Sequence, residues 1–180
     1  DVYAPSRTEM DVTDWESIDY AMKSFVPDVL INNAGYISPC SVRNADLVNT
    51  KKHIDINLGG IFYCTEIALK YNPGLIIINI GSAAAIEIHA NWSEYCATKA
   101  AVVMATKCWA EDGLYAVVIS PARTRTKMRR NLYPHEDQDT LLEPHDFAKV
   151  VSKAVNQEFK TGTHIVVRKQ NVNNILKGEI

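Results

Sequence analysis

The chain has 180 residues, 47% of them hydrophobic and 22% charged, a globular composition that excludes a disordered tail or a fibrous repeat. Its 19 basic and 21 acidic residues give a net charge of −2, which disfavours a protein that binds nucleic acid by neutralising phosphates. It has no apolar run of about 18 residues, no signal-peptide pattern and no metal-ligand spacing among its four cysteines, so we expect a cytoplasmic protein without a membrane segment or a metal site.

Strand-like and helix-like segments alternate along the chain, which predicts an α/β fold on a mainly parallel sheet. Helices are expected over residues 13–25, which open with a capping-box spacing, and over 44–71, 93–110 and 144–157. Short apolar, β-branched runs predict strands over 26–31, 74–80, 114–119 and 164–167.

Two places are short for such a fold. A doubly wound sheet usually begins with a strand, a glycine-rich turn and a helix, yet no glycine precedes Gly35. At residues 110–114 a helix must give way to a strand with little connection. We therefore expect a single Rossmann-type domain over residues 1–180, incomplete at its N-terminus, with residues missing at both places.

Tyr95 and Lys99 are four residues apart, so they share one face of the predicted helix. An ammonium near a phenol favours the phenolate and lowers the phenol pKa, which makes a tyrosine usable as a proton donor or acceptor. A solvated helix face explains the same spacing.

Three further places carry polar or small residues where chemistry is expected. Ser82 follows the 74–80 strand, at the end where open α/β sheets bind ligands, although a turn cap is the alternative. The run Asn32-Asn33-Ala34-Gly35 follows the 26–31 strand, where small residues admit a ligand and amides can tie neighbouring strands. Asn57 precedes two glycines inside a predicted helix, a conflict expected where function overrides propensity.

These motifs resemble those of the short-chain dehydrogenase/reductases. The Asn32-Asn33-Ala34-Gly35 turn, Asn57, Ser82, Tyr95-x-x-x-Lys99 and Ser120-Pro121 occur in the family's order, and the interval of 13 residues from Ser82 to Tyr95 is the family's usual one. The run after Pro121 resembles its Pro-Gly-x-x-x-Thr element, with Ala122 in place of glycine. The resemblance spans about residues 1–170 and implies a doubly wound Rossmann-type sheet with helices on both faces.

The resemblance also implies an NAD(P)-dependent oxidoreductase that interconverts a carbonyl and an alcohol. Tyr95 would be the general acid/base, Lys99 would lower its pKa and hold the nicotinamide ribose, Ser82 would polarise the reacting oxygen, and Asn57 would hold a water in a proton relay. The cofactor-binding residues would be Arg7, Asp11, Asn33, Ala34, Gly35, Tyr95, Lys99, Pro121, Thr124 and Thr126.

Arg7 occupies the place where NAD enzymes of this type carry an acid, at the end of the second strand. Because arginine pairs bidentately with phosphate, NADP(H) is favoured over NAD(H), with an exposed arginine as the alternative. Asp11, followed by Val12 at the end of a strand, would contact the adenine.

Five cations crowd the segment after Pro121: Arg123, Arg125, Lys127, Arg129 and Arg130. They favour an anionic substrate, such as a phosphorylated sugar or polyol, or the cofactor phosphates, although a solvated helix face fits equally well. The expected substrate contacts are Ser82, Tyr95, Arg123 and Arg125, with His89, Trp92 and Tyr133 as further candidates for the pocket wall.

The helices expected over 44–71 and 93–110 resemble those that pair across a two-fold axis in this family. An apolar stripe suits such a bundle and favours a homodimer or homotetramer, although a core stripe is the competing interpretation: Met104, Ala105, Cys108 and Trp109. Because the glycine-rich turn is absent, the alternative to an enzyme is a catalytically inactive domain of the same fold that serves dimerisation or nucleotide sensing in a larger protein.

Overall fold

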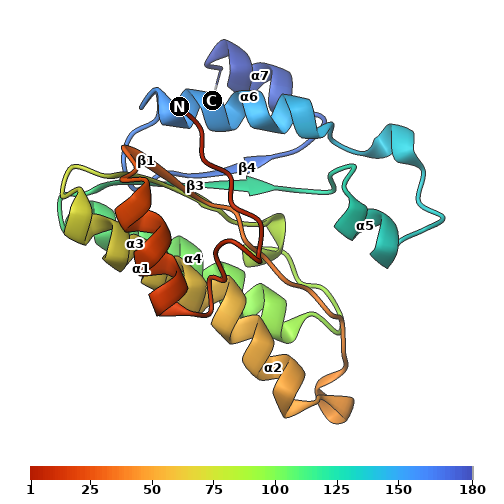
Figure 1. Cartoon of the computed structure of the whole chain (residues 1–180). Helices are drawn as coiled ribbons and strands as arrows, with labels where there is room; N and C mark the ends of the chain where they lie inside the picture. The colour runs from red at the N-terminus through yellow and green to blue at the C-terminus, as the bar shows by residue number, and fades with distance from the viewer. Residues whose placement is uncertain (180) are drawn as a thin grey trace.

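The computed structural model describes residues 1–179, which form a parallel sheet with helices on both faces (Figure 1). Strands β1 (Val29–Asn32), β2 (Ile76–Ile80), β3 (Tyr115–Pro121) and β4 (His164–Val167) lie side by side in chain order. All neighbours pair parallel, with Ile31 opposite Ile78 and Ile78 opposite Val117. The predicted α/β fold is confirmed, and the carboxyl ends of all four strands meet at one edge of the sheet.

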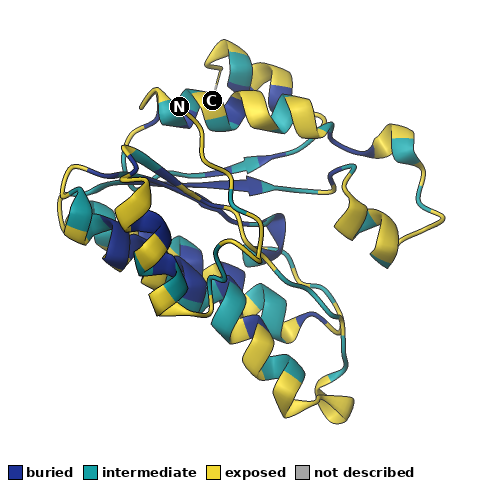
Figure 2. Cartoon of the chain, viewed as in Figure 1, coloured by how far each residue is buried: buried dark blue, intermediate teal, exposed yellow. Residues whose placement is uncertain are grey.

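One face of the sheet is covered by α1 (Trp15–Ser24), α3 (Gly60–Tyr71) and α4 (Ser93–Glu111) (Figure 1). Ile77 and Ala116 point to this side and pack with buried residues of α1 and α3. The buried sides of these helices face the sheet, while their outer sides are exposed (Figure 2).

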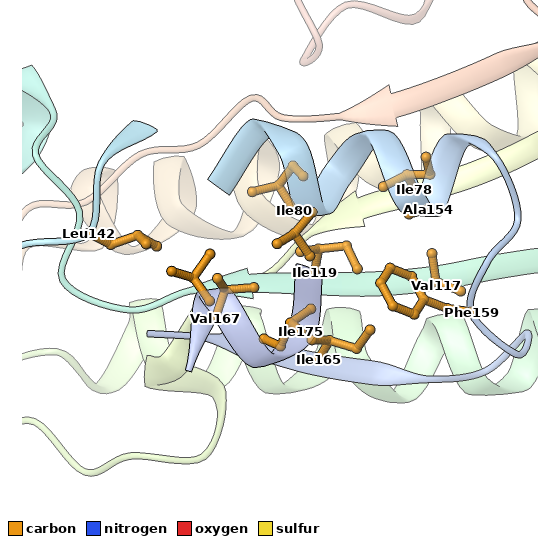
Figure 3. Packing of buried hydrophobic residues seen from close by; sticks show 12 residues of the cluster. Ile78, Ile80, Val117, Ile119, Leu142, Ala154, Phe159, Ile165, Val167 and Ile175 are labelled. Atoms are coloured by element: carbon orange, nitrogen blue, oxygen red, sulfur yellow. The ribbon is translucent and has the colours of Figure 1, made fainter. Parts of the chain in front are cut away.

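The opposite face is covered by α6 (Pro144–Val155) and α7 (Val172–Lys177). Successive residues of a strand point to opposite faces, so Ile78 and Val117 turn to this side. They pack with Ala154 and Ile175 in a second apolar cluster (Figure 3). Burial on both faces explains why the strands read as continuous β-branched runs.

The 44–71 segment, predicted as one helix, is divided. It contains α2 (Leu47–Ile54), a π-helical turn (Asp55–Gly59) and α3. The turn buries Asn57, and a Cβ atom at Gly60 would lie 2.9 Å from Cγ2 of Val12. The N-terminal segment therefore packs directly on the helix backbone at Gly60, a contact that no local pattern predicts. The short helices α5 (Lys127–Leu132) and α7 were not predicted either.

The prediction that strands end at Arg7 and at Asp11–Val12 is wrong. Residues 6–9 form a turn, and within residues 1–179 no strand precedes β1. The cap of α1 is Asp14 rather than Thr13, and its carboxylate accepts from the amides of Glu16 and Ser17.

The expectation that residues are missing between the helix and the strand at 110–114 is also wrong. Gly113 has a φ of +90°, its amide donates to the Ala110 carbonyl (3.1 Å), and the Leu114 amide donates to the Trp109 carbonyl (3.0 Å). A left-handed glycine that ends a helix in this way reverses the chain within two or three residues. The connection from α4 to β3 therefore needs no additional residues.

Candidate active site

A cavity of about 290 Å³ lies at the carboxyl ends of the strands, and we call it the Tyr95 cavity. Its walls come from the segment after β2, the first turns of α4, the segment after β3, and α5. It brings together eight of the predicted site residues: Asn33, Ser82, Tyr95, Lys99, Pro121, Arg123, Thr124 and Thr126. His89 and Trp92 line it as well.

Lys99 is buried, and its Nζ donates a hydrogen bond of 2.8 Å to the carbonyl oxygen of Ile80. Burial lowers the pKa of Lys99 from 10.5 to about 8. An ammonium has three N–H groups, and among the described residues only Ile80 accepts from this one. Two donors of a buried cation are thus left for a bound group.

Tyr95 and Ser82 face each other in this cavity. Burial raises the pKa of the Tyr95 phenol above its usual value, and a hydrogen bond with the Ser82 hydroxyl opposes that rise. Nζ of Lys99 lies 5.9 Å from the centre of the Tyr95 ring. We expected Lys99 to lower the phenol pKa, but the loss of solvation outweighs any such effect, so the phenol is neutral near pH 7.

Ser82 is also a turn cap, because its Oγ accepts from the amide of Ala84 at 3.2 Å. The two interpretations given by the sequence therefore hold together. The cap fixes the Ser82 side chain at the end of β2, and its hydroxyl still contacts the Tyr95 phenol.

Asn57 is fully buried and does not line the Tyr95 cavity. Its Oδ1 accepts from the amide of Tyr36 (2.7 Å), and its Nδ2 donates to the Tyr36 carbonyl (2.8 Å) and to Oγ1 of Thr98 (3.4 Å). The Thr98 hydroxyl in turn donates to the Tyr95 carbonyl (2.9 Å). Asn57 thus connects the turn after β1 to the helical turn that carries Tyr95. Thr98, which the sequence analysis missed, is distinguished by no local signal.

Asn32, the last residue of β1, confirms the expectation that an amide in this turn ties neighbouring strands. Its Nδ2 donates to Oδ1 of Asn79 on β2 (2.8 Å) and to Oγ1 of Thr65 (3.1 Å). Asn79 continues the buried network by donating to Oγ1 of Thr106 on α4 (2.8 Å). The edge of the sheet that carries the cavity is therefore cross-linked to both α3 and α4.

Five predicted cofactor or substrate residues do not line the Tyr95 cavity. Four belong to the predicted cofactor set and are exposed or half-buried: Arg7, Asp11, Ala34 and Gly35. The fifth is Arg125 of the predicted substrate set. Arg7 pairs with Asp11 (3.2 Å) and is 75% exposed. Arg125 donates to the Gln138 carbonyl (2.8 Å) and pairs with Glu143 (3.1 Å).

Aromatic packing fixes one wall of the cavity. The rings of His89 and Trp92 lie 4.7 Å apart, and Trp92 meets Tyr95 edge to face at 5.7 Å. Tyr133 lies 6.4 Å beyond Trp92 and lines a neighbouring cavity instead. Trp92 thereby limits the orientations open to the Tyr95 ring.

The residues present fit one half of a nicotinamide dinucleotide. The two spare donors of Lys99 suit ribose hydroxyls, and Asn33 and the 121–126 segment supply the walls of a pocket beyond the strand ends. The pyrophosphate of such a cofactor is usually held by a glycine-rich turn at a helix N-terminus, and residues 1–179 place no such turn beside the cavity.

The sequence matches the family model for short chain dehydrogenase over residues 6–137. An uncharacterised oxidoreductase of Staphylococcus aureus (strain N315) is 30% identical over 162 residues, covering 82% of this chain and 68% of that protein. The 3-oxoacyl-[acyl-carrier-protein] reductase FabG of Thermotoga maritima is 29% identical over 150 residues, covering 74% of this chain and 58% of the relative.

Solved structures show the same similarity. A short chain dehydrogenase/reductase family protein superposes with a TM-score of 0.79 at 26% identity, covering 88% of this chain and 73% of the other. ElxO with NADP bound gives a TM-score of 0.76 at 25% identity, with 88% and 74% covered. A 4-hydroxyisoleucine dehydrogenase complexed with NADH gives 0.74 at 25% identity, with 88% and 77% covered.

Proposed function

The chain belongs to the short-chain dehydrogenase/reductase family of NAD(P)-dependent oxidoreductases, and on that premise we propose that it interconverts a carbonyl and an alcohol with Tyr95 as the general acid/base. The observation that supports this proposal most strongly is the meeting of Tyr95, Ser82 and Lys99 in one cavity at the strand ends. A neutral phenol, a hydroxyl and a buried ammonium are the groups needed to protonate an oxygen that gains negative charge.

In carbonyl reduction, the Ser82 hydroxyl donates to the substrate oxygen and holds it beside the Tyr95 phenol. The raised pKa of Tyr95 keeps its proton in place until negative charge develops on that oxygen. The nicotinamide, when bound, supplies the hydride to the carbon.

Lys99 has two tasks in this scheme. Its positive charge would stabilise the phenolate that remains once Tyr95 has given up its proton, and its spare N–H groups would hold the ribose hydroxyls of a bound cofactor. Asn57 is proposed to act at a distance, by holding the turn of α4 that carries Tyr95 and, as the resemblance implies, by anchoring a relay water.

NADP(H) is the proposed cofactor, with NAD(H) as the alternative. The support is Arg7, whose largely exposed guanidinium is free to exchange Asp11 for a phosphate. Asp11 is proposed to contact the adenine, and Asn33, Ala34 and Gly35 to line the adenosine half. Thr126 and the Pro121–Thr124 backbone are proposed to contact the nicotinamide amide and the pyrophosphate. A lower KM for NADPH than for NADH, lost in Arg7→Gln, is the expected result.

A homodimer or homotetramer in the cytoplasm is proposed as the working form. Leu47 and Val48 on α2 and Met104 on α4 are exposed apolar side chains that a partner copy would cover, whereas Trp109 packs on Phe62 within the chain (5.3 Å). All four cysteines are free. Within residues 1–179 no helix is long and apolar enough to cross a membrane.

The test is a panel of carbonyl compounds, including sugar phosphates, with NADPH oxidation followed by absorbance and NADPH binding followed by nicotinamide fluorescence. We expect carbonyl-dependent oxidation of NADPH by the full-length protein. A flat fluorescence titration together with no oxidation would favour the alternative, a catalytically inactive domain of this fold.

A further inference from the structure

A second cavity, of about 430 Å³, adjoins the Tyr95 cavity, and we call it the Arg168 cavity. Its walls come from four separate parts of the chain: the segment after β2, the end of β3, α5 with the loop that follows it, and the segment between β4 and α7. Its lining includes four cationic and two acidic side chains: Arg123, Arg129, Arg168, Lys169, Glu87 and Glu136.

The two cavities are continuous. Glu87, His89, Arg123 and Arg129 line both of them. A row of aromatic side chains also extends from one cavity to the other. Trp92 packs on Tyr95 on one side and on Tyr133, which lines the Arg168 cavity, on the other. One small molecule can therefore occupy both cavities, with its reacting carbon at Tyr95 and its far end at Arg168.

The charge of the Arg168 cavity is positive. Four cationic side chains line it against two carboxylates. Glu136 holds Arg129 through two hydrogen bonds of 2.6 Å, and Glu87 pairs with Arg168. These two acids fix two of the arginines in place but cannot neutralise the whole set.

The remaining two cations keep their charge available. Among the described residues Arg123 pairs only with Glu136, at 3.6 Å, and it is 62% exposed, while that carboxylate is already engaged with Arg129. Lys169 donates to the backbone carbonyl of Asp139, and within residues 1–179 no carboxylate pairs with it. A cavity with this excess favours an anion over water.

We propose that the Arg168 cavity binds an anionic group, a phosphate ester or a carboxylate, at the end of the substrate remote from the reacting carbonyl. This inference rests on the proposed function and deepens it, since it names the substrate class and the side chains that select it. The residues that select the anion are Arg123, Arg168 and Lys169. Arg168 and Lys169 follow β4 and lie outside the cationic segment after Pro121. Arg125, which that pattern does include, is held by Gln138 and Glu143 instead.

The first test needs no turnover. Binding of inorganic phosphate, and separately of acetate, to the full-length protein is measured by calorimetry at constant ionic strength. We expect phosphate or acetate to bind, and affinity for the preferred anion to fall roughly tenfold or more in Arg168→Gln and Lys169→Gln. Arg130→Gln removes the same charge from an exposed position outside both cavities and is expected to bind the anion as the wild type does.

The second test compares D-glyceraldehyde 3-phosphate, succinic semialdehyde and D-glyceraldehyde as substrates with NADPH. In the first two compounds the phosphate or carboxylate lies at the end of the molecule remote from the aldehyde. We expect one of the two anionic carbonyl compounds to have a kcat/KM at least about tenfold above the neutral one, and Lys169→Gln to remove most of that preference while leaving the KM for NADPH unchanged. Lys169 is exposed, and in the part of the chain that the structure describes its side chain donates a hydrogen bond only to a backbone carbonyl. This variant is therefore expected to fold even if Arg168→Gln does not.

The inference would be overturned by anion binding that is absent, by anion binding that is equal in wild type and both variants, or by a raised KM for NADPH with unaltered substrate preference. The last would assign the cations to the cofactor phosphates. Reduction of neutral carbonyls without any anion preference would refute this inference alone. Variant-sensitive phosphate or acetate binding without any carbonyl reduction would support the anion site and refute the proposed function.

Discussion

Nζ of Lys99 donates a hydrogen bond of 2.8 Å to the carbonyl oxygen of Ile80, the last residue of β2. This contact fastens the second turn of α4 to the strand end from which Ser82 emerges two residues later. It also buries a cation, and burial lowers the pKa of Lys99 to about 8. The site is therefore built at a cost in stability, which can be measured.

Substitution Lys99→Met removes that cost. In the wild type the protonated lysine is disfavoured only in the folded state, so between pH 8 and 10.5 the unfolded chain holds a proton that the folded chain has released. Over that range the unfolding free energy of the wild type should rise relative to that of Lys99→Met by up to about 3 kcal/mol. Urea denaturation of both proteins at pH 7 and pH 10 measures the difference, and parallel pH curves would contradict it.

Substitution Gly81→Ala should destabilise the strand end that carries Ser82. A Cβ atom there would lie 2.2 Å from Oγ of Ser120 and 2.7 Å from Cγ1 of Val118, and Ser120 is itself fully buried and hydrogen-bonded to His164 (2.8 Å). We expect a loss of about 2 kcal/mol in unfolding free energy and a fall in kcat, because the next residue must move.

The matched control for this variant is Gly74→Ala. The nearest atom to a Cβ at Gly74 is 3.4 Å away, and the residue lies at the opposite end of the strand. Its unfolding free energy is expected to change by less than about 0.5 kcal/mol. Equal denaturation midpoints for the two variants would refute the packing argument.

The buried amide network should show energetic coupling. Asn79→Ala removes the acceptor of Asn32 and the donor to Thr106 inside the core, at an expected cost of about 2–3 kcal/mol. In a double-mutant cycle, Asn32→Ala should cost less once Asn79 has been replaced. Strictly additive losses would show that the two side chains do not support each other, and the exposed Asn173→Ala is the control for a neutral asparagine replacement.

The sequence predicts the sheet well because strands that are buried on both faces are continuous runs of apolar, β-branched residues. The 74–80 run contains β2, and the 164–167 run matches β4. The division of the 44–71 helix leaves no such signal, because the π-helical turn depends on Val12 packing on Gly60 and on Asn57 reaching Tyr36. Both are contacts between segments far apart in the chain.

The site follows the same rule. Ser82, Tyr95 and Lys99 are predictable because strand ends and helix spacing place them, and the resemblance to a family adds their order. The direction of the Tyr95 pKa shift is not predictable, since it depends on how far the folded chain removes solvent from the ring. Arg168 was missed because it is separated from Arg123 by β4 and two helices, and only the fold brings them to one cavity.

The most direct test of the account is the rate of carbonyl reduction by Tyr95→Phe, measured alongside NADPH affinity. The substitution removes one oxygen atom from a ring that Trp92 keeps in place, so the fold and the cofactor pocket should persist. We predict that kcat falls about a thousandfold or more while the NADPH dissociation constant stays within a factor of about three. A variant that reduces the same substrate within about tenfold of the wild-type rate would show that the proton comes from elsewhere.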